Sequence, residues 1–286
     1  LEWAMPSDAD IIAGQIAPYR EQLADADAIV FVGGTDHNLD CEGRDRTSMQ
    51  FPQGQTELIR QVSAINGKTI VVLMHGAPID LPWIDRVPAV LDMFFPGMEG
   101  GTAMADILFG DADPSGRLTF SWPERLEDSP VYELATQDVD NVNYEDSLMV
   151  GYRYFDTKRV TPRYEFGYGL SYTTFDYSKM KVKKDGDNCV VTLHVKNTGS
   201  RDGAEVVQIY VGQKNCRYTR PVHELKAFDK VFLKPGESRE VTFTLDKDAF
   251  SYWNPDRRAW VRDSDEFTIE AGHSSRDIRR SAKVRF

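Results

Sequence analysis

The 286-residue sequence predicts an α/β domain followed by an all-β domain. In residues 1–123, short apolar runs alternate with segments of helical periodicity, which is the pattern of an α/β unit with a mostly parallel sheet. In residues 175–286, apolar and polar positions alternate with a period of two, and turn signals separate the runs. Residues 124–174 keep no clean repeat but are rich in aromatic side chains, so we expect an ordered connector between the two domains.

The elements of residues 1–123 follow from where the apolar runs begin and end. Gly33-Gly34 and Pro96-Gly97 come after apolar runs and break them, while apolar residues between the runs recur at helical spacing. The expected strands cover residues 28–32, 69–74 and 89–95, and the expected helices cover residues 9–25 with an interruption at Pro18, 53–65 and 100–109.

The elements of residues 175–286 follow from the alternation, which is clearest in residues 190–196. Val191, Leu193 and Val195 face one side of the expected strand, and the residues between them face the other. About seven short strands over ~110 residues, separated by turns, are typical of a β-sandwich. Further strands are expected over residues 205–211, 230–233, 239–245 and 266–271.

Composition excludes several classes of protein. With 34 Lys+Arg against 45 Asp+Glu, the net charge of −11 would repel a phosphate backbone, so we expect no nucleic-acid binding. No apolar run reaches the ~18–20 residues of a membrane-spanning helix, so we expect no membrane partner. Three distant cysteines predict neither a disulfide framework nor a zinc site. Few cysteines and no signal sequence favour the cytoplasm, with periplasmic and secreted protein as alternatives.

The loop after the first expected strand is the first place to look for chemistry. Ligands of open α/β sheets bind beyond the carboxyl ends of the strands. This loop carries four carboxylates, and crowded carboxylates of which one is partly desolvated can leave one protonated near neutral pH as a general acid. The residues alone leave a second interpretation open, a solvated loop with a structural ion pair. The acidic residues are Asp36, Asp40, Glu42 and Asp45, and the structural pair would join Asp45 to Arg46.

Other catalytic chemistries have less support. Gly33-Gly34 lacks the G-x-G-x-x-G spacing of a dinucleotide site, and no G-x-S-x-G nucleophile motif is present. The five histidines are scattered singly, without Cys or carboxylate neighbours at metal-ligand spacing. We therefore expect no metal and no cofactor. Trp83 could stack on a sugar, but beside two prolines it favours core packing.

A set of motifs in fixed order resembles one family. The ordered motifs are Glu42-Gly-Arg-Asp-Arg46, Gly76-Ala-Pro78, Pro96-Gly-Met-Glu-Gly-Gly101, Val150-Gly-Tyr-Arg-Tyr-Phe155, Phe166-Gly-Tyr-Gly-Leu-Ser-Tyr172 and Arg220-Pro-Val-His-Glu-Leu-Lys226. Together they resemble the C-terminal half of a glycoside hydrolase family 3 enzyme of the β-glucosidase kind. The first motifs are similar to its α/β sandwich domain, and the last to its fibronectin type III-like module.

The resemblance implies a retaining mechanism in which two carboxylates flank the anomeric carbon. The family's acid/base Glu falls on Glu42, and its nucleophile is an Asp in a separate (β/α)8 barrel. For Asp45 and Arg46 we expect a supporting role that fixes the loop. Asp40, two residues before Glu42, is the rival for the acid.

The sequence also departs from the family. No barrel precedes residue 1, and the opening strand of the sandwich domain is not visible, so the implied partners are a β-glucoside or oligosaccharide and the missing barrel segment or chain. We expect residues 1–286 to be a fragment or subunit of a larger enzyme. A β-xyloside is the alternative substrate, and a non-catalytic carbohydrate-binding or scaffold module is the alternative function.

Overall fold

A computed structural model describes residues 7–43, 46–132, 143–144 and 146–286. The chain divides into two compact units, residues 1–108 and residues 109–286. The boundaries expected at residues 123 and 174 stay predictions. No helix within the described ranges is both long and apolar enough to cross a membrane.

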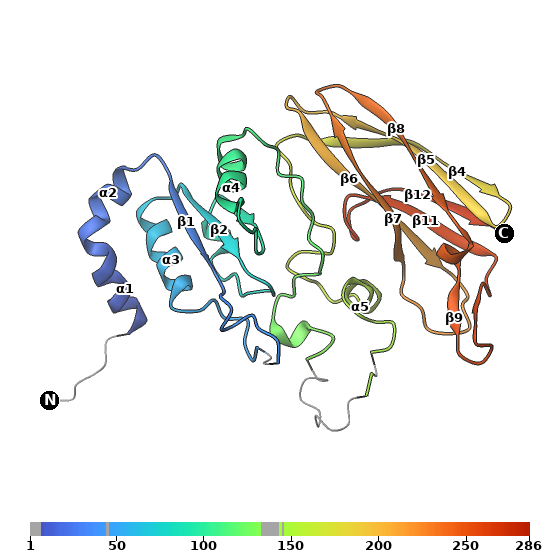
Figure 1. The fold of residues 1–286 in the computed structure, drawn as a ribbon, viewed down its shortest axis with the longest axis horizontal. Coiled ribbons are helices and arrows are strands. Elements are labelled where there is room, and N and C mark those ends of the chain that lie inside the picture. The colour runs from blue at the N-terminus through green and yellow to red at the C-terminus, as the bar shows by residue number, and fades with distance from the viewer. Residues whose placement is uncertain (1–6, 44–45, 133–142, 145) are drawn as a thin grey trace. The chain divides into compact units, whose positions relative to one another are not determined.

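Unit 1 is an α/β unit with three parallel strands in the order β1-β2-β3 (Figure 1). Helices α1 and α2 contact α3, and α3 contacts β2. The α-helices and strands are α1 (Asp8–Ile16), α2 (Arg20–Asp25), β1 (Ile29–Gly34), α3 (Gln55–Ile65), β2 (Thr69–Met74), β3 (Ala89–Asp92) and α4 (Gly100–Phe109), with 3-10 turns η1 (Ala17–Tyr19) and η2 (Ile84–Arg86).

The local sequence explains where several of these elements begin and end. Ser7 caps α1 by accepting a hydrogen bond from the Asp10 backbone, and Asp10 completes a capping box. The strand expected over residues 69–74 and the helix expected over 100–109 have the predicted bounds. The strand expected over 89–95 was too long. It ends at Asp92 because Asp92 Oδ1 accepts a hydrogen bond from Phe94 N at 3.1 Å and Phe94 has a φ of 50°, which a strand cannot continue.

Unit 2 contains two antiparallel sheets that form the expected β-sandwich (Figure 1). Their strand orders are β12-β11-β6-β7 and β4-β5-β8, and β9-β10 form a separate hairpin. The strands are β4 (Phe175–Asp185), β5 (Asn188–Asn197), β6 (Gly203–Gln213), β7 (Glu224–Leu233), β8 (Ser238–Leu245), β9 (Tyr252–Asn254), β10 (Ala259–Val261), β11 (Glu266–Gly272) and β12 (Ile278–Arg285). The helical turns are η3 (Leu126–Asp128), α5 (Tyr152–Lys158) and η5 (Lys247–Phe250).

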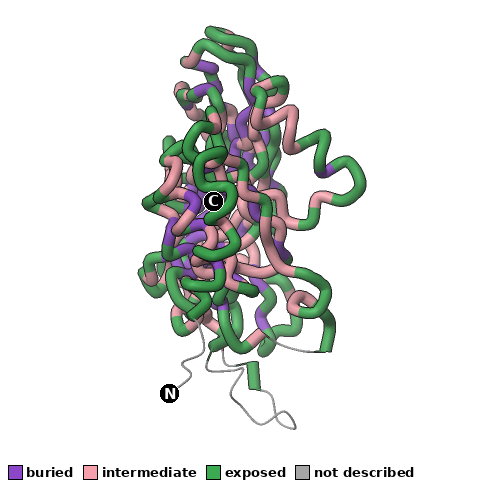
Figure 2. Tube along the Cα trace, turned by 90° about the vertical axis from the view of Figure 1, so that its left-hand side faces the viewer, coloured by how far each residue is buried: buried purple, intermediate pink, exposed green. Residues whose placement is uncertain are grey.

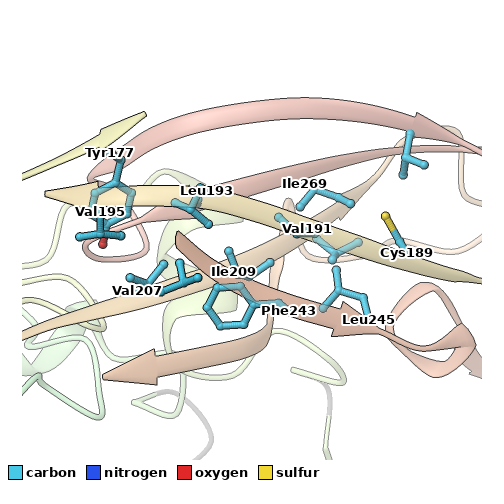
Figure 3. Packing of buried hydrophobic residues seen from close by; sticks show 14 of the residues in the cluster. Tyr177, Cys189, Val191, Leu193, Val195, Val207, Ile209, Phe243, Leu245 and Ile269 are labelled. Atoms are coloured by element: carbon cyan, nitrogen blue, oxygen red, sulfur yellow. The ribbon is translucent and has the colours of Figure 1, made fainter. Parts of the chain in front are cut away.

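The core of unit 2 lies between the two sheets. Buried and more exposed positions alternate along β5 and β8, as the period of two predicts. Figure 2 colours the chain by burial, with buried segments inside and exposed segments on the outside. Val191, Leu193 and Val195 on β5 point into a cluster shared with Ile209 on β6 and Ile269 on β11 (Figure 3). All five are fully buried. The alternation read from the sequence therefore identifies the core face.

Part of the segment expected as an ordered connector packs within unit 2. The carboxylate of Asp113 accepts hydrogen bonds from Ser171 Oγ at 2.7 Å, Tyr172 N at 2.8 Å and Ala204 N at 3.1 Å. Asp113 thus joins its own segment to residues 171–172 and to the start of β6. Ser171 and Tyr172, near the C-terminal end of the expected connector, are therefore bonded to the same side chain as Ala204 on β6.

An ionic cluster joins α5 to the sandwich. His223 lies between two carboxylates, with Nε2 3.2 Å from Asp156 Oδ2 and Nδ1 2.7 Å from Glu270 Oε2. Arg276 bonds Asp156 and also donates to the backbone oxygens of Phe155 and Val160, at 2.9 and 2.7 Å. Burial alone would lower the pKa of His223, but the hydrogen bonds to Asp156 and Glu270 outweigh it and raise the pKa to about 9.

Candidate active site

Three loops meet at the carboxyl edge of the sheet in unit 1. Because β1, β2 and β3 are parallel, the loops that begin at Thr35, His75 and Met93 leave the same edge. This is the edge where α/β sheets bind ligands. It is also where the sequence placed the candidate site.

The start of the first loop is fixed by a very close approach between β1 and β2. A Cβ on Gly34 would lie 1.6 Å from the carbonyl oxygen of Met74, so only glycine fits here. Thr35 N donates to that same oxygen at 2.9 Å. The side-chain amide of Gln55, the first residue of α3, bonds both the N–H and the C=O of Gly34, each at 2.9 Å. The loop after β1 therefore leaves the sheet from a rigid point.

Glu42 lies exposed on this loop. Within the described ranges, no hydrogen bond or ion pair engages its carboxylate. Gly43 follows with a φ of 79°, a left-handed conformation that glycine adopts without strain. Such a carboxyl group is free to exchange a proton with a bound molecule.

Asp40 has the opposite environment. Its Oδ2 accepts hydrogen bonds from Thr35 Oγ1 and from Gly76 N, the latter at 3.0 Å, and its Oδ1 lies 3.7 Å from Arg46 Nη1. Only 10% of the side chain is exposed. The rival for the acid is thus held by groups of the protein itself.

Arg46 bridges two loops. Besides approaching Asp40, its Nη1 donates to the backbone oxygens of Ala77 and Pro78, both at 3.3 Å. These contacts tie the loop after β1 to the loop after β2. The loop-fixing role expected for Arg46 stays a prediction. Asp45, its expected companion, lies outside the described residues.

His75 and Asp92 form a pair at the same edge. His75 is fully buried, with Nδ1 2.9 Å from Ala77 O and Nε2 3.1 Å from Asp92 Oδ1. His75 comes directly after β2, and Asp92 is the last residue of β3. Their positions at two neighbouring strand ends were the signal that could have identified them.

Two other candidates have local roles. Trp83 is 1% exposed and packs near Phe51, with ring centroids 6.5 Å apart, so it is a core residue as the sequence favoured. Asp36 is exposed, and its carboxylate bonds the side chain and backbone of Asn38. The side-chain hydrogen bond from Asn38 is the main cause that lowers the pKa of Asp36.

A groove of about 920 Å³ is lined by the loop after β1, the start of α3 and the loop after β2. Arg46, Gln53 and Asp80 are among its lining residues, but Glu42 is not, so the exposed carboxyl lies outside it. In the parts of the chain that the structure describes, no three His, Cys, Asp or Glu side chains are arranged to hold a metal ion.

Comparison with known families matches residues 12–172 to the glycosyl hydrolase family 3 C-terminal domain. Residues 205–275 match a fibronectin type III-like domain. The first match alone covers more than half of the 286 residues. The chain belongs to glycosyl hydrolase family 3.

Individual relatives agree with this assignment. The thermostable β-glucosidase B of Acetivibrio thermocellus is 44% identical over 270 residues, which are 93% of this chain and 36% of the relative. An exo-α-(1→6)-L-arabinopyranosidase of Bifidobacterium breve is 40% identical over 266 residues, 92% of this chain and 35% of the relative. The crystal structure of a Bifidobacterium adolescentis GH3 β-glucosidase matches with a TM-score of 0.92 at 38% identity, covering 99% of this chain and 42% of that one. The chain thus spans about a third of the length of these two curated relatives.

Proposed function

We propose that this chain carries the general acid/base of a retaining, exo-acting β-glycosidase, and that Glu42 is that residue. The nucleophile would lie on a (β/α)8 barrel outside these 286 residues. The observation that carries the proposal is the contrast between two carboxylates on one loop. Glu42 is exposed and unengaged within the described ranges, whereas Asp40 is held by Thr35, Gly76 and Arg46.

The chemistry required of Glu42 has two steps. In the first, its carboxylic acid protonates the glycosidic oxygen of the leaving group while the nucleophile attacks the anomeric carbon. In the second, the resulting carboxylate takes a proton from water, and that water attacks the glycosyl-enzyme intermediate. Both steps need a carboxyl group that can meet the substrate without first breaking contacts within the protein.

For the substrate we propose terminal, non-reducing β-D-glucosyl residues. Two of the relatives described above carry the name β-glucosidase, and one is named for an α-linked L-arabinopyranoside. A panel of aryl β-glucoside, β-xyloside and α-L-arabinopyranoside tests this choice in the complete enzyme. A kcat/KM highest for the glucoside supports it, and a higher value for either other glycoside contradicts it.

The role of Glu42 is tested by Glu42→Ala in the complete polypeptide that joins this chain to its barrel. Removing a positioned acid is expected to lower kcat/KM by about 10²–10⁴-fold for glucosides with poor leaving groups. A 2,4-dinitrophenyl glucoside needs no protonation, so its glycosylation step is expected to change little. Added azide should restore turnover and yield a glucosyl azide, since azide replaces water without needing a base.

The matched control is Asp36→Ala, which removes an exposed carboxylate from the same loop and is expected to leave these rates unchanged. Equal rates for Glu42→Ala and the unaltered enzyme on all leaving groups would refute the assignment. That outcome would favour a non-catalytic binding or scaffold module instead.

A further inference from the structure

The Asp40 carboxylate joins the loop after β1 to the loop after β2. Gly76 N reaches Asp40 Oδ2 at 3.0 Å across 36 residues of sequence, and Thr35 Oγ1 donates to the same oxygen from the start of the loop that carries Asp40. With Arg46 near the other oxygen, every described contact of this carboxylate comes from the two loops. Charged hydrogen bonds of this kind are about twice as strong as neutral ones.

Asp40 also packs closely against Gly76. A Cβ at this position would lie 3.4 Å from Asp40 Oδ2, which is an ordinary van der Waals contact, and 2.9 Å from the half-exposed ring of Phe95, which would have to shift. The Asp40 carboxylate is therefore both hydrogen-bonded to Gly76 N and in close reach of its Cα.

The loop after β2 is itself anchored to β3. Buried His75 contacts Ala77 O and the Asp92 carboxylate, and Asp92 also accepts the hydrogen bond from Phe94 N. The segment that receives Asp40 is therefore fixed to the end of a neighbouring strand. Asp40 thus connects its own loop to a rigid part of unit 1.

We propose that Asp40 is a positioning residue for Glu42, which rests on the proposed role of Glu42 as acid/base. Two residues of extended chain span at most about 7 Å, so fixing Asp40 confines the place from which the Glu42 side chain starts. Proton transfer requires hydrogen-bond distance to the glycosidic oxygen, and a misplacement of about 1 Å can cost roughly 100-fold in rate. Both Asp40 oxygens are engaged within the protein, which suits positioning and not proton transfer.

The test compares Asp40→Ala with Asp40→Asn in the complete enzyme, using a series of aryl glucosides that differ in leaving-group ability. Asp40→Ala is expected to lower kcat/KM by about 10–100-fold on poor leaving groups. The effect on the 2,4-dinitrophenyl glucoside should be far smaller, because only the acid is displaced. Asp40→Asn retains an oxygen that can accept from Gly76 N and Thr35 Oγ1, so it should recover most of the lost rate. Asp36→Ala is again the matched control on the same loop.

Three outcomes overturn the proposal. A loss equal on all leaving groups, or a lower Tm without a change in rate, would mean that Asp40 only stabilises the fold. Azide rescue of Asp40→Ala with formation of glucosyl azide would make Asp40 the acid/base. Failure of the proposed role of Glu42 gives a different result. In that case Glu42→Ala would not change kcat/KM for any leaving group, regardless of the rates of the Asp40 variants.

A second variant keeps the test decisive if Asp40→Ala does not fold. Thr35→Val leaves Asp40 and Gly76 in place but removes the hydroxyl that donates to Asp40 Oδ2. We expect the same pattern with a smaller loss on poor leaving groups and little change for the 2,4-dinitrophenyl glucoside. An unchanged leaving-group dependence in a folded Thr35→Val enzyme would contradict the role of the Asp40 hydrogen bonds.

Discussion

Alkaline pH should destabilise unit 2 through a single histidine. The pKa of His223 is 6.5 in an unfolded chain and about 9 in the folded protein. Below pH 6.5 both states hold the proton, and the full contribution to stability is present. Between pH 6.5 and 9 the folded state holds more protons than the unfolded state, so the free energy of unfolding falls as pH rises.

The size of this effect follows from the pKa difference. At 1.36 kcal/mol for each pKa unit, the difference corresponds to about 3 kcal/mol, lost at up to about 1.4 kcal/mol for each pH unit. The His223 side chain is only 9% exposed, so solvent screens the two carboxylates little. A loss of about 3 kcal/mol is a large part of the 5–15 kcal/mol typical of a folded domain.

Two measurements test this reasoning. An NMR titration of the histidine ring protons should show one residue that titrates near pH 9. Denaturant unfolding at pH 6 to 9.5 should show the fall in stability for the unaltered chain and a much flatter profile for His223→Gln. His194→Gln is the control, because that side chain is 30% exposed and has one ion pair, to Glu240 at 3.3 Å. The same pH slope in the unaltered chain and in His223→Gln would refute the account.

Three further substitutions probe packing. Leu193→Ala removes a fully buried side chain from the sandwich core (Figure 3) and should lower the free energy of unfolding by about 2–5 kcal/mol in a urea titration; a loss under about 1 kcal/mol would contradict the packing. Gly34→Ala would place a Cβ 1.6 Å from a carbonyl oxygen of β2, so hydrogen exchange should show unit 1 unprotected. Gly14→Ala, in α1 with open space around it, should instead raise the free energy of unfolding by roughly 0.5–1 kcal/mol. The same change in stability for Gly34→Ala and Gly14→Ala would contradict the close approach at Gly34.

The sequence predicted most of the fold because local pattern and tertiary burial agree there. Val191, Leu193 and Val195 alternate with polar residues, and burial in the sandwich follows the same period. Helix α5 was not predicted, since Tyr152 and Phe155 are its only buried residues and too few to show a helical repeat. It is defined instead by contacts from Leu225 on β7 and from His223 and Arg276 in the loops around it, which no local pattern encodes.

For the candidate site, the sequence predicted the loop and the residue types but not their separate environments. Composition left Asp36, Asp40 and Glu42 as similar carboxylates on one loop. Which of them is held and which is exposed depends on contacts from Gly76 and Arg46, and so on how two loops meet at a sheet edge. The pairing of strands sets that geometry, and it is not readable from spacing along the chain.

The contact between Arg276 and α5 has a consequence for how the protein is made. The Phe155 carbonyl accepts hydrogen bonds from the backbone nearby and also from Arg276, which lies 121 residues further along the chain. At roughly 5–20 residues per second, a ribosome adds those residues in about 6–24 s. A helix of seven residues is only marginally stable by itself in water, and α5 lacks the contacts of Arg276 during that interval. During synthesis this segment is therefore open to chaperones and proteases, from which the finished sandwich protects it.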